Sequence, residues 1–410
     1  MAREKIPGVS VAVMKDNHVI YQKGFGFADM ERKVKSTPNT IYGIASITKS
    51  FTALTIMRLM EAGKLTIDDP VKKYLPDFRL KNYDQIEAIT IHHVMSHTTG
   101  IPTIERRETL TSFEEHLHYL QEVDVQPMGK PGEYFCYNND LYLLLGAIIE
   151  KVTGRDYREV IQEEIIGPNE MNRTTFHIEE LEKFDDVSTP YQLKDGEVKP
   201  CAWPKLGNYA VGGGIRSTVL DLLKYGTIYL EGADAMKKPV HLTNGQSYYG
   251  YGLQLTPNYA GKTLVEHGGS QPGVSSNFGV VPEEDLIVAV LTNVNGASAG
   301  DIWLYAVNAV CGMPLQQRRY LEPHFHLKEQ EQSKFIGKFM TGEGSVIEIV
   351  SVIGELHAKI EGKLIKLRAS RKQTLVAQIF EKPLRFYFDE KGWAWALFYG
   401  LRMYIREDEG

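Results

Sequence analysis

The sequence predicts an α+β protein in which an antiparallel sheet with helices on its faces is followed by a small up-and-down β-barrel. Strand-like segments occur at both ends of residues 1–312, with strongly apolar helices between them. Such an arrangement favours a sheet that pairs the two ends of one segment. A polar stretch then breaks the pattern, and only short alternating segments separated by turns come after it. We therefore divide the chain into a first domain (1–312), a linker (313–331) and a barrel (332–410).

The first domain begins with apolar or alternating runs at 9–14 and 19–26, which predict a β-hairpin. Residues 47–62 predict a helix that ends at Gly63. Apolar side chains cover most of its circumference, as is typical of a helix buried in the middle of a domain. A second apolar helix is predicted at 141–152.

The later part of this domain returns to strands. Gly212-Gly213-Gly214 predicts a tight turn, and Ser217-Thr218 with Asp221 at capping-box spacing predicts the start of a helix. Strands are expected at 264–266, 276–281 and 286–291. The domain should therefore close its sheet with its last strands beside its first.

The C-terminal region is predicted to be a barrel of eight strands. The expected strands are 335–339, 346–350, 356–360, 364–367, 374–380, 384–388, 393–398 and 401–405. Regular short strands of this kind favour a small barrel. Eight strands close a barrel that side chains just fill.

Composition excludes several classes of function. The chain has 410 residues and a net charge of −6, which gives no reason to expect nucleic acid or an anionic membrane as a partner. No apolar run reaches the length of a membrane span. The N-terminus leads straight into a strand-like run without a signal-peptide core. Cys136, Cys201 and Cys311 are too few for a disulfide framework, so we expect a cytoplasmic protein.

Ser46-Ile47-Thr48-Lys49 is the first motif that carries chemistry. Residues three apart share one face of a helix, so this spacing joins a nucleophile to a candidate base. A serine hydroxyl needs a base to remove its proton, and lysine serves only when burial or nearby positive charge lowers its pKa. A Ser-x-x-Lys tetrad alone is about equally well explained by a helix cap and an incidental lysine.

Tyr137-Asn138-Asn139 precedes the second helix. The phenol of Tyr137 suits proton transfer near Lys49, and the Asn139 carboxamide suits holding the lysine and a substrate carbonyl. A packing tyrosine and an asparagine N-cap are the simpler interpretation of this motif alone.

His267-Gly268-Gly269-Ser270 ends a predicted strand. Glycines at this place let a substrate backbone lie close to the strand edge. The backbone N–H of Ser270, together with that of Ser46, suits an oxyanion hole. Taken alone, the motif is better explained as a glycine turn beside a surface histidine.

Other candidate sites are weaker. His92, His93 and His97 include an i, i+4 pair that suits zinc, but no further ligand stands out, so we favour a structural role and expect no metal or other cofactor. Arg368 and Arg385 are the barrel cations that we considered for reaching a neighbour's active site, although nothing in the sequence requires it.

The three motifs, in this order, resemble those of the penicillin-recognising serine hydrolases, a superfamily of class C β-lactamases, penicillin-binding proteins, D-aminopeptidases and esterases. The resemblance extends over about residues 7–312 and includes 7–13, 24–26, 95–102, 146–150 and 212–218. It implies a class C β-lactamase-like domain with an additional all-helical part. It also implies that Ser46 is acylated, that Lys49 and Tyr137 share the proton transfers, and that Asn139 and residues 267–270 bind substrate.

One position departs from the best-known members of the superfamily. Classes that act on penicillins and C-terminal carboxylates carry Lys-Thr-Gly where this chain has His267-Gly268-Gly269, and a neutral imidazole pairs poorly with a carboxylate. The D-aminopeptidases and esterases are similar to this chain here. The resemblance thus implies a peptidase for small peptides, including those with D-residues, with an esterase or weak β-lactamase as the alternative.

The barrel extends the resemblance. A class C-like domain followed by a lipocalin-like barrel is similar to the CubicO group of self-compartmentalising serine peptidases. This resemblance implies a closed, octamer-like homo-oligomer in which the barrel screens the active site. The alternatives are a barrel that only stabilises the monomer and a non-catalytic scaffold, although the intact Ser46, Lys49 and Tyr137 argue against a scaffold.

Overall fold

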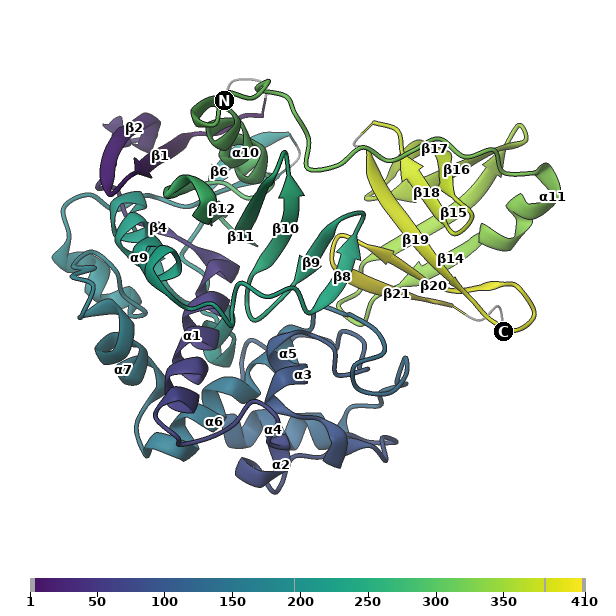
Figure 1. The fold of residues 1–410 in the computed structure, drawn as a ribbon, viewed down its shortest axis with the longest axis horizontal. Helices are drawn as coiled ribbons and strands as arrows, with labels where there is room; N and C mark the ends of the chain where they lie inside the picture. Colours follow the sequence, from purple (N-terminus) through teal and green to yellow (C-terminus); the bar gives the residue numbers. More distant parts are fainter. Residues whose placement is uncertain (1–3, 195, 380, 408–410) are drawn as a thin grey trace.

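The computed structural model describes residues 4–194, 196–379 and 381–407 (Figure 1). A nine-stranded antiparallel sheet forms the centre of the first domain, in the order β3-β2-β1-β13-β12-β11-β10-β9-β8. These strands are β1 (Gly8–Lys15), β2 (His18–Asp29), β3 (Val34–Lys35), β8 (His241–Asn244), β9 (Ser247–Tyr249), β10 (Gln254–Tyr259), β11 (Lys262–Gln271), β12 (Val274–Val281) and β13 (Leu286–Thr292). Two short pairs, β4 (Tyr42–Gly43) with β7 (Arg216–Ser217) and β5 (Tyr191–Lys194) with β6 (Glu197–Pro200), lie outside it.

Helices cover both faces of the sheet. Alternate residues of β13 pack with α9 (Val219–Glu231) on one side and with Trp303 of α10 (Ala299–Val310) on the other. All seven residues of β13 are buried, because an antiparallel strand covered on both faces keeps no polar side. The larger core, on the α9 side, also contains α1 (Thr48–Glu61).

An all-helical part lies below the sheet in the view of Figure 1, around the far end of α1. Its helices are α2 (Val71–Tyr74), α3 (Ile91–Met95), α4 (Phe113–Glu122), α5 (Asn139–Tyr142) and α6 (Leu144–Thr153), with α7 (Tyr157–Ile161) and a π-helical turn (Gln162–Ile166) following them. Among the described residues, no helix is long and apolar enough to cross a membrane.

Most predicted elements of this domain are confirmed. The hairpin is β1–β2, and Val9 pairs with Thr292, which joins the first strand to the last. The buried helix is α1, and Thr218 caps α9 by accepting from the Asp221 N–H. The second helix is divided at Leu143 into α5 and α6.

The prediction of a tight turn at Gly212-Gly213-Gly214 is wrong. The first two of these glycines belong to a short helix, α8 (Ala210–Gly213). This helix is held against α1, since Thr52 donates to the Val211 carbonyl and the Ile215 N–H donates to Thr48. The glycines are therefore explained by a close approach to α1 rather than by a turn.

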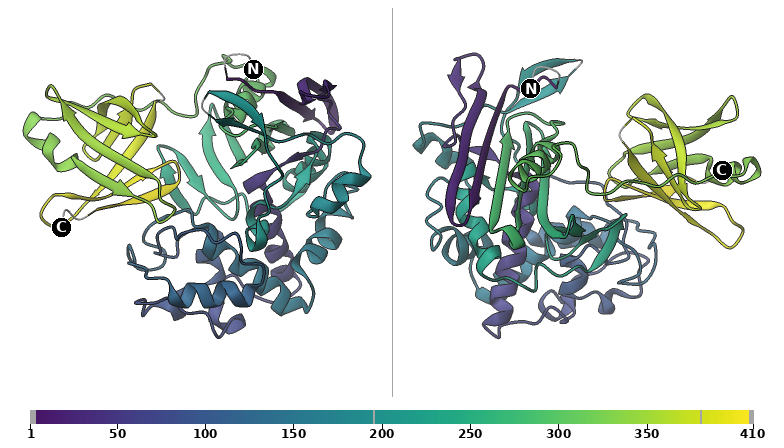
Figure 2. Two further views of the ribbon diagram at one scale, coloured as in Figure 1. Left: turned by 180° about the vertical axis from the view of Figure 1, so that it is seen from behind. Right: turned by 45° about the horizontal axis from the view of Figure 1, so that its top comes forward.

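The barrel closes as predicted, with all eight strands antiparallel and in sequence order (Figures 1 and 2). They are β14 (Gly337–Met340), β15 (Val346–Val352), β16 (Glu355–Ile360), β17 (Lys363–Arg371), β18 (Thr374–Ala377), β19 (Lys382–Phe388), β20 (Ala394–Tyr399) and β21 (Arg402–Arg406). The first strand starts later than expected, because Ser333–Phe335 form a 3-10 helix. Phe380, expected to end a strand, lies outside the described residues.

The stretch interpreted as a linker contains one short helix, α11 (Glu329–Gln332), which extends one residue past its predicted end. Arg319 in this stretch makes a two-pronged ion pair with Glu266 of β11 at 2.6 and 2.7 Å. This part of the stretch is therefore fastened to the first domain.

The barrel packs directly on the first domain. Phe398 and Met403 share one apolar cluster with Phe135, Tyr137 and Tyr249. The Tyr137 N–H donates to the carbonyl of Leu401 at 3.0 Å, in the turn between β20 and β21. This turn consequently lies beside the Tyr137-Asn138-Asn139 motif.

Candidate active site

Ser46 lies in a 3-10 turn (Ala45–Ile47) that leads into α1. The residue before it, Ala45, has a φ of +46°, a left-handed conformation that is uncommon outside glycine and often marks functional sites. The carbonyl of Ile44 accepts from Ser276 of β12 at 2.8 Å, and a Cβ on Gly269 would lie 2.4 Å from the same carbonyl oxygen. Gly269 is thus required by the close packing of the Ser46 turn on β11.

Lys49 is buried at the start of α1. Its Nζ donates to Asn139 Oδ1 at 2.9 Å and to the carbonyl of Gly212 at 3.1 Å. Burial, followed by the charges of Arg402 and Arg106, holds the pKa of Lys49 well below its usual range. The uncharged amine is therefore favoured, and both of its N–H groups have acceptors while its lone pair remains for a proton.

Gly212 leaves room for this amine. A Cβ at Gly212 would lie 2.7 Å from the Nζ of Lys49. The helix α8 therefore approaches α1 closely enough for its carbonyl to accept from the lysine only because residue 212 has no side chain.

Tyr137 lies against the same amine, with its ring centre 4.8 Å from the Lys49 Nζ. Among the described residues, its buried hydroxyl has no hydrogen-bond partner. Burial raises the pKa of Tyr137 to about 12, and the nearby Ser46 hydroxyl opposes this rise. A buried polar group without a partner calls for an explanation, and a group that awaits substrate is one.

His267 is enclosed rather than presented to substrate. Its Nδ1 lies 2.6 Å from the Gly268 carbonyl, which only accepts, so Nδ1 carries the proton and Nε2 accepts from the Tyr249 hydroxyl at 2.9 Å. Burial is the main cause that lowers the pKa of His267 to about 3. The neutral imidazole inferred from the sequence agrees with these contacts, and both ring nitrogens are occupied by the protein itself.

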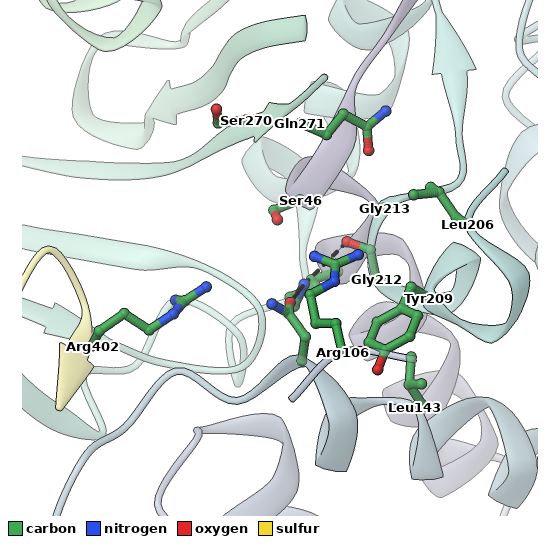
Figure 3. A pocket seen from close by; sticks show the side chains of 12 residues that line it. Ser46, Arg106, Leu143, Leu206, Tyr209, Gly212, Gly213, Ser270, Gln271 and Arg402 are labelled. Atoms are coloured by element: carbon green, nitrogen blue, oxygen red, sulfur yellow. Dashed lines mark hydrogen bonds between the residues drawn. The ribbon is translucent and has the colours of Figure 1, made fainter. Parts of the chain in front are cut away.

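A small cavity of about 80 Å³ opens at Ser46 (Figure 3). Four predicted site residues line it, namely Ser46, Lys49, Asn139 and Ser270. The other predicted site residues, Tyr137, His267, Gly268 and Gly269, are not among the residues that line it. The other lining residues are Arg106, Leu143, Leu206, Tyr209, Gly212, Gly213, Gln271 and Arg402. The predicted motifs therefore converge, and two arginines are added to them.

Arg402 belongs to the barrel and extends from the start of β21 toward Ser46 (Figure 3). Its guanidinium Nε pairs with Glu343 Oε2 at 2.9 Å, and Glu343 Oε1 accepts from Asn139 Nδ2 at 3.1 Å. Although burial opposes ionisation, Arg402 holds the pKa of Glu343 below its usual range. The barrel thus supplies charged groups to the site of its own chain.

Sequence reasoning missed these contributions. Arg385, one barrel cation considered, donates to the carbonyls of Leu242 and Thr243 at the domain contact, and Arg368 pairs with Glu381, so neither lines the cavity. No local pattern separates Arg402 from other barrel arginines. Its position depends on how the two domains pack.

Residues 1–310 match the model of the Beta-lactamase family. The chain belongs to the Beta-lactamase family. Members of this family and its penicillin-binding relatives are serine hydrolases, so the predicted superfamily and enzyme class are confirmed.

Curated relatives of this Beta-lactamase family protein include Protein flp of Staphylococcus aureus (strain MW2), which is 31% identical over 304 residues. That match covers 71% of this chain and 60% of the relative, so the chain spans less than two thirds of the length of Protein flp. Penicillin-binding protein 4* of Bacillus subtilis (strain 168) is 24% identical over 385 residues, covering 87% of this chain and 84% of that protein.

Two solved structures are similar over both the catalytic domain and the barrel. The octameric penicillin-binding protein homologue from Pyrococcus abyssi is 33% identical, with a TM-score of 0.73, and the match covers 99% of this chain and 97% of that one. The crystal structure of SurE is 21% identical, with a TM-score of 0.76, and the match covers 99% of this chain and 96% of that one. At this identity the match shows that the two folds are similar. The predicted combination of a class C-like domain with a C-terminal barrel is thereby confirmed.

Proposed function

We propose that this chain is a serine peptidase that hydrolyses small peptides, including peptides with D-residues, through an acyl-enzyme on Ser46. The observation that carries the proposal is the state of Lys49. A buried lysine whose two N–H groups donate to Asn139 and Gly212 has one lone pair left, on the same helix start as the serine. Such a lysine suits a base for the serine hydroxyl.

The opposite pKa shifts of Lys49 and Tyr137 support an assignment of roles. The lysine is favoured as the free amine, whereas burial keeps the tyrosine protonated. Pairs of titratable groups pushed apart in this way supply a base and an acid at one pH. Lys49 is the base in this proposal, and Tyr137 is the acid that returns the proton.

Acylation then proceeds in two steps. The Oγ of Ser46 attacks the scissile carbonyl carbon while its proton passes to the Nζ of Lys49. Backbone N–H groups of Ser46 and Ser270 stabilise the oxyanion. The carbon–nitrogen bond breaks, and the leaving amine takes a proton from Tyr137, which is restored from Lys49. In deacylation, a water molecule attacks the acyl carbon while its proton passes to the same base. The bond to the Oγ of Ser46 breaks and the Oγ takes a proton, which releases the carboxylic acid and free Ser46.

An esterase or weak β-lactamase is the second candidate, and one observation favours it. His267 is neutral and enclosed, but Arg106 and Arg402 line the cavity and bring positive charge that the third motif lacks. An arginine pairs well with a carboxylate, such as the one that penicillins carry. The site therefore carries more positive charge than the neutral His267 alone suggests.

A closed homo-oligomer is also part of the proposal. The Pyrococcus abyssi homologue is described as octameric and is similar over 99% of this chain, barrel included. The cytoplasmic setting is proposed with it, because Cys136, Cys201 and Cys311 are unpaired. Light scattering of the full chain after gel filtration tests the assembly. A mass near eight chains is expected, and a monomer at all concentrations would contradict it.

A substrate panel tests the activity. Short L- and D-peptides with free and blocked termini, D-amino-acid amides, short-chain esters and nitrocefin are compared by kcat/KM, with Ser46→Ala as the blank. We expect turnover of small peptides and a measurable rate with D-residues. Turnover of esters alone would refute the peptidase, and turnover of nitrocefin above all peptides would favour the second candidate.

A further inference from the structure

Four side chains form a hydrogen-bonded row from the barrel to the candidate base. Arg402 of β21 donates to Glu343 at 2.9 Å, Asn139 donates to Glu343 at 3.1 Å, and Lys49 donates to Asn139 at 2.9 Å. Glu343 lies in the turn between β14 and β15, so half of this row comes from the barrel. Each member has a partner on both sides except the terminal arginine and lysine.

From this row we propose that Glu343 is a positioning residue for catalysis, which orients the Asn139 amide so that its oxygen faces Lys49. The inference rests on the proposed function, because it concerns the base of that reaction. It makes the barrel part of the active site of its own chain, in addition to any role in assembly.

The two ends of the Asn139 side-chain amide differ in what they can bond. The two ends of the Asn139 carboxamide are nearly equal in size, but one only accepts and the other only donates. An ionised carboxylate only accepts, so Glu343 selects the NH₂ end and leaves the oxygen for Lys49. Without Glu343, the amide can reverse and place an N–H group against the Nζ of Lys49, where it opposes a lysine N–H or occupies the lone pair that the base needs.

Glu343 and Arg402 are held in place independently of this row. The N–H of Gly342 donates to Thr103 at 3.0 Å, and a Cβ there would lie 1.9 Å from the Thr103 carbonyl oxygen, so the turn sits tightly on the catalytic domain. On the other side, Leu401 accepts from the Tyr137 N–H. Two backbone contacts therefore fix the barrel residues that flank the row.

The charges around Lys49 indicate that Glu343 acts by orienting Asn139 and not by forming an ion pair with the lysine. Arg402 and Arg106 disfavour the ammonium form, and Glu343 favours it. His97 and His267, which lie near the amine, are neutral because burial lowers the pKa of both. Glu343 bonds to the Asn139 amide and not to the lysine, so its carboxylate orients the base through a neutral group.

A double-mutant cycle tests this role. The rate constant for acylation by an activated ester is measured for the full chain and for Glu343→Ala, Glu343→Gln, Asn139→Ala and the double variant Glu343→Ala with Asn139→Ala. We expect Glu343→Ala to slow acylation by about 10- to 100-fold, as for loss of a hydrogen bond to a charged group. The single acceptor of glutamine should give a smaller loss.

The cycle separates positioning from general stability. With Asn139→Ala already present, Glu343→Ala should change the rate by less than about 2-fold, because its target is gone. An equal loss in both backgrounds, or normal acylation of Glu343→Ala, would overturn the inference. Failure of the unmodified chain to acylate at Ser46 would overturn the proposed function as well.

Glu348→Gln is the matched control, since Glu348 is another barrel carboxylate in an ion pair, with Lys359 at 2.8 Å on the surface. It should acylate at the rate of the unmodified chain. A loss as large as that of Glu343→Gln would assign the effect to barrel charge in general and contradict the inference.

Discussion

The guanidinium of Arg402 lies 4.6 Å from the ring centre of Tyr137, so a barrel residue packs on a residue of the second catalytic motif. Arg402 is also the first cause, after burial, of the low pKa of Lys49. The barrel therefore affects both proton-transfer groups of the candidate site, and this contact leads to the first prediction.

Replacing Arg402 by methionine should move the pH dependence of acylation. Loss of the cation raises the pKa of Lys49, so the lysine stays protonated to a higher pH and the acidic limb of kcat/KM shifts upward. The profile of Arg402→Met against that of the unmodified chain is the measurement. Lys359→Met, which removes an exposed barrel cation, should leave the limb in place. Equal profiles for Arg402→Met and the unmodified chain would contradict this role.

The buried lysine also predicts how stability depends on pH. The folded pKa of Lys49 is depressed, so between that pKa and the ordinary value of 10.5 the unfolded chain binds more protons. Stability contributed through this group then rises with pH up to about 10.5. Melting temperatures of the unmodified chain should therefore improve relative to Lys49→Met as pH rises. A constant or opposite difference would show that the lysine is charged in the fold.

Gly212→Ala should impair the site without disrupting the domain. The new methyl group would lie 2.7 Å from the Lys49 Nζ, so this amine must move away from the Gly212 carbonyl and toward the cavity that it lines. Acylation should fall by about 10-fold or more, as for displacement of a base by a fraction of an ångström. Gly300→Ala in α10 is the control. Its new Cβ would lie 3.7 Å from the nearest atom, an ordinary van der Waals contact. Similar rates for the two variants would refute this account of Gly212.

The apolar contact between the domains should be needed for both stability and activity. Phe398 of β20 is buried against Phe135, with ring centres 5.9 Å apart. Phe398→Ala should cost about 3–5 kcal/mol in the free energy of unfolding, as is usual for a buried phenylalanine. It should also slow acylation. Leu364→Ala, at a half-exposed barrel position, should cost much less. Denaturant unfolding measures the effect on stability, and ester acylation measures the effect on activity. Full activity of Phe398→Ala would show that the active site does not depend on this contact with the barrel.

Local patterns were sufficient for much of the fold. Apolar side chains around most of the circumference, with Gly63 at the end, predicted α1, and period-two alternation with turn residues predicted the eight barrel strands. The spacing of Ser46 and Lys49 predicted their neighbourhood, because helical geometry fixes it over three residues. The order of the three motifs then predicted the family.

What the sequence did not reveal depends on contacts between distant segments. Gly212 was interpreted as a turn residue, whereas its contact partner is Lys49, 163 positions away. Glu343 and Arg402 occupy ordinary barrel turns and strands, and they acquire their place only when the barrel packs on Tyr137 and Asn139. No periodicity or propensity encodes such packing.

The most direct test of the account is to locate the covalent adduct. The full chain is treated with a fluorophosphonate, its intact mass is measured, and the modified peptide is mapped. We predict a single adduct on Ser46 that is absent from Ser46→Ala, while circular dichroism of that variant is unchanged. An adduct on another residue, or labelling that persists in Ser46→Ala, would contradict the acyl-enzyme.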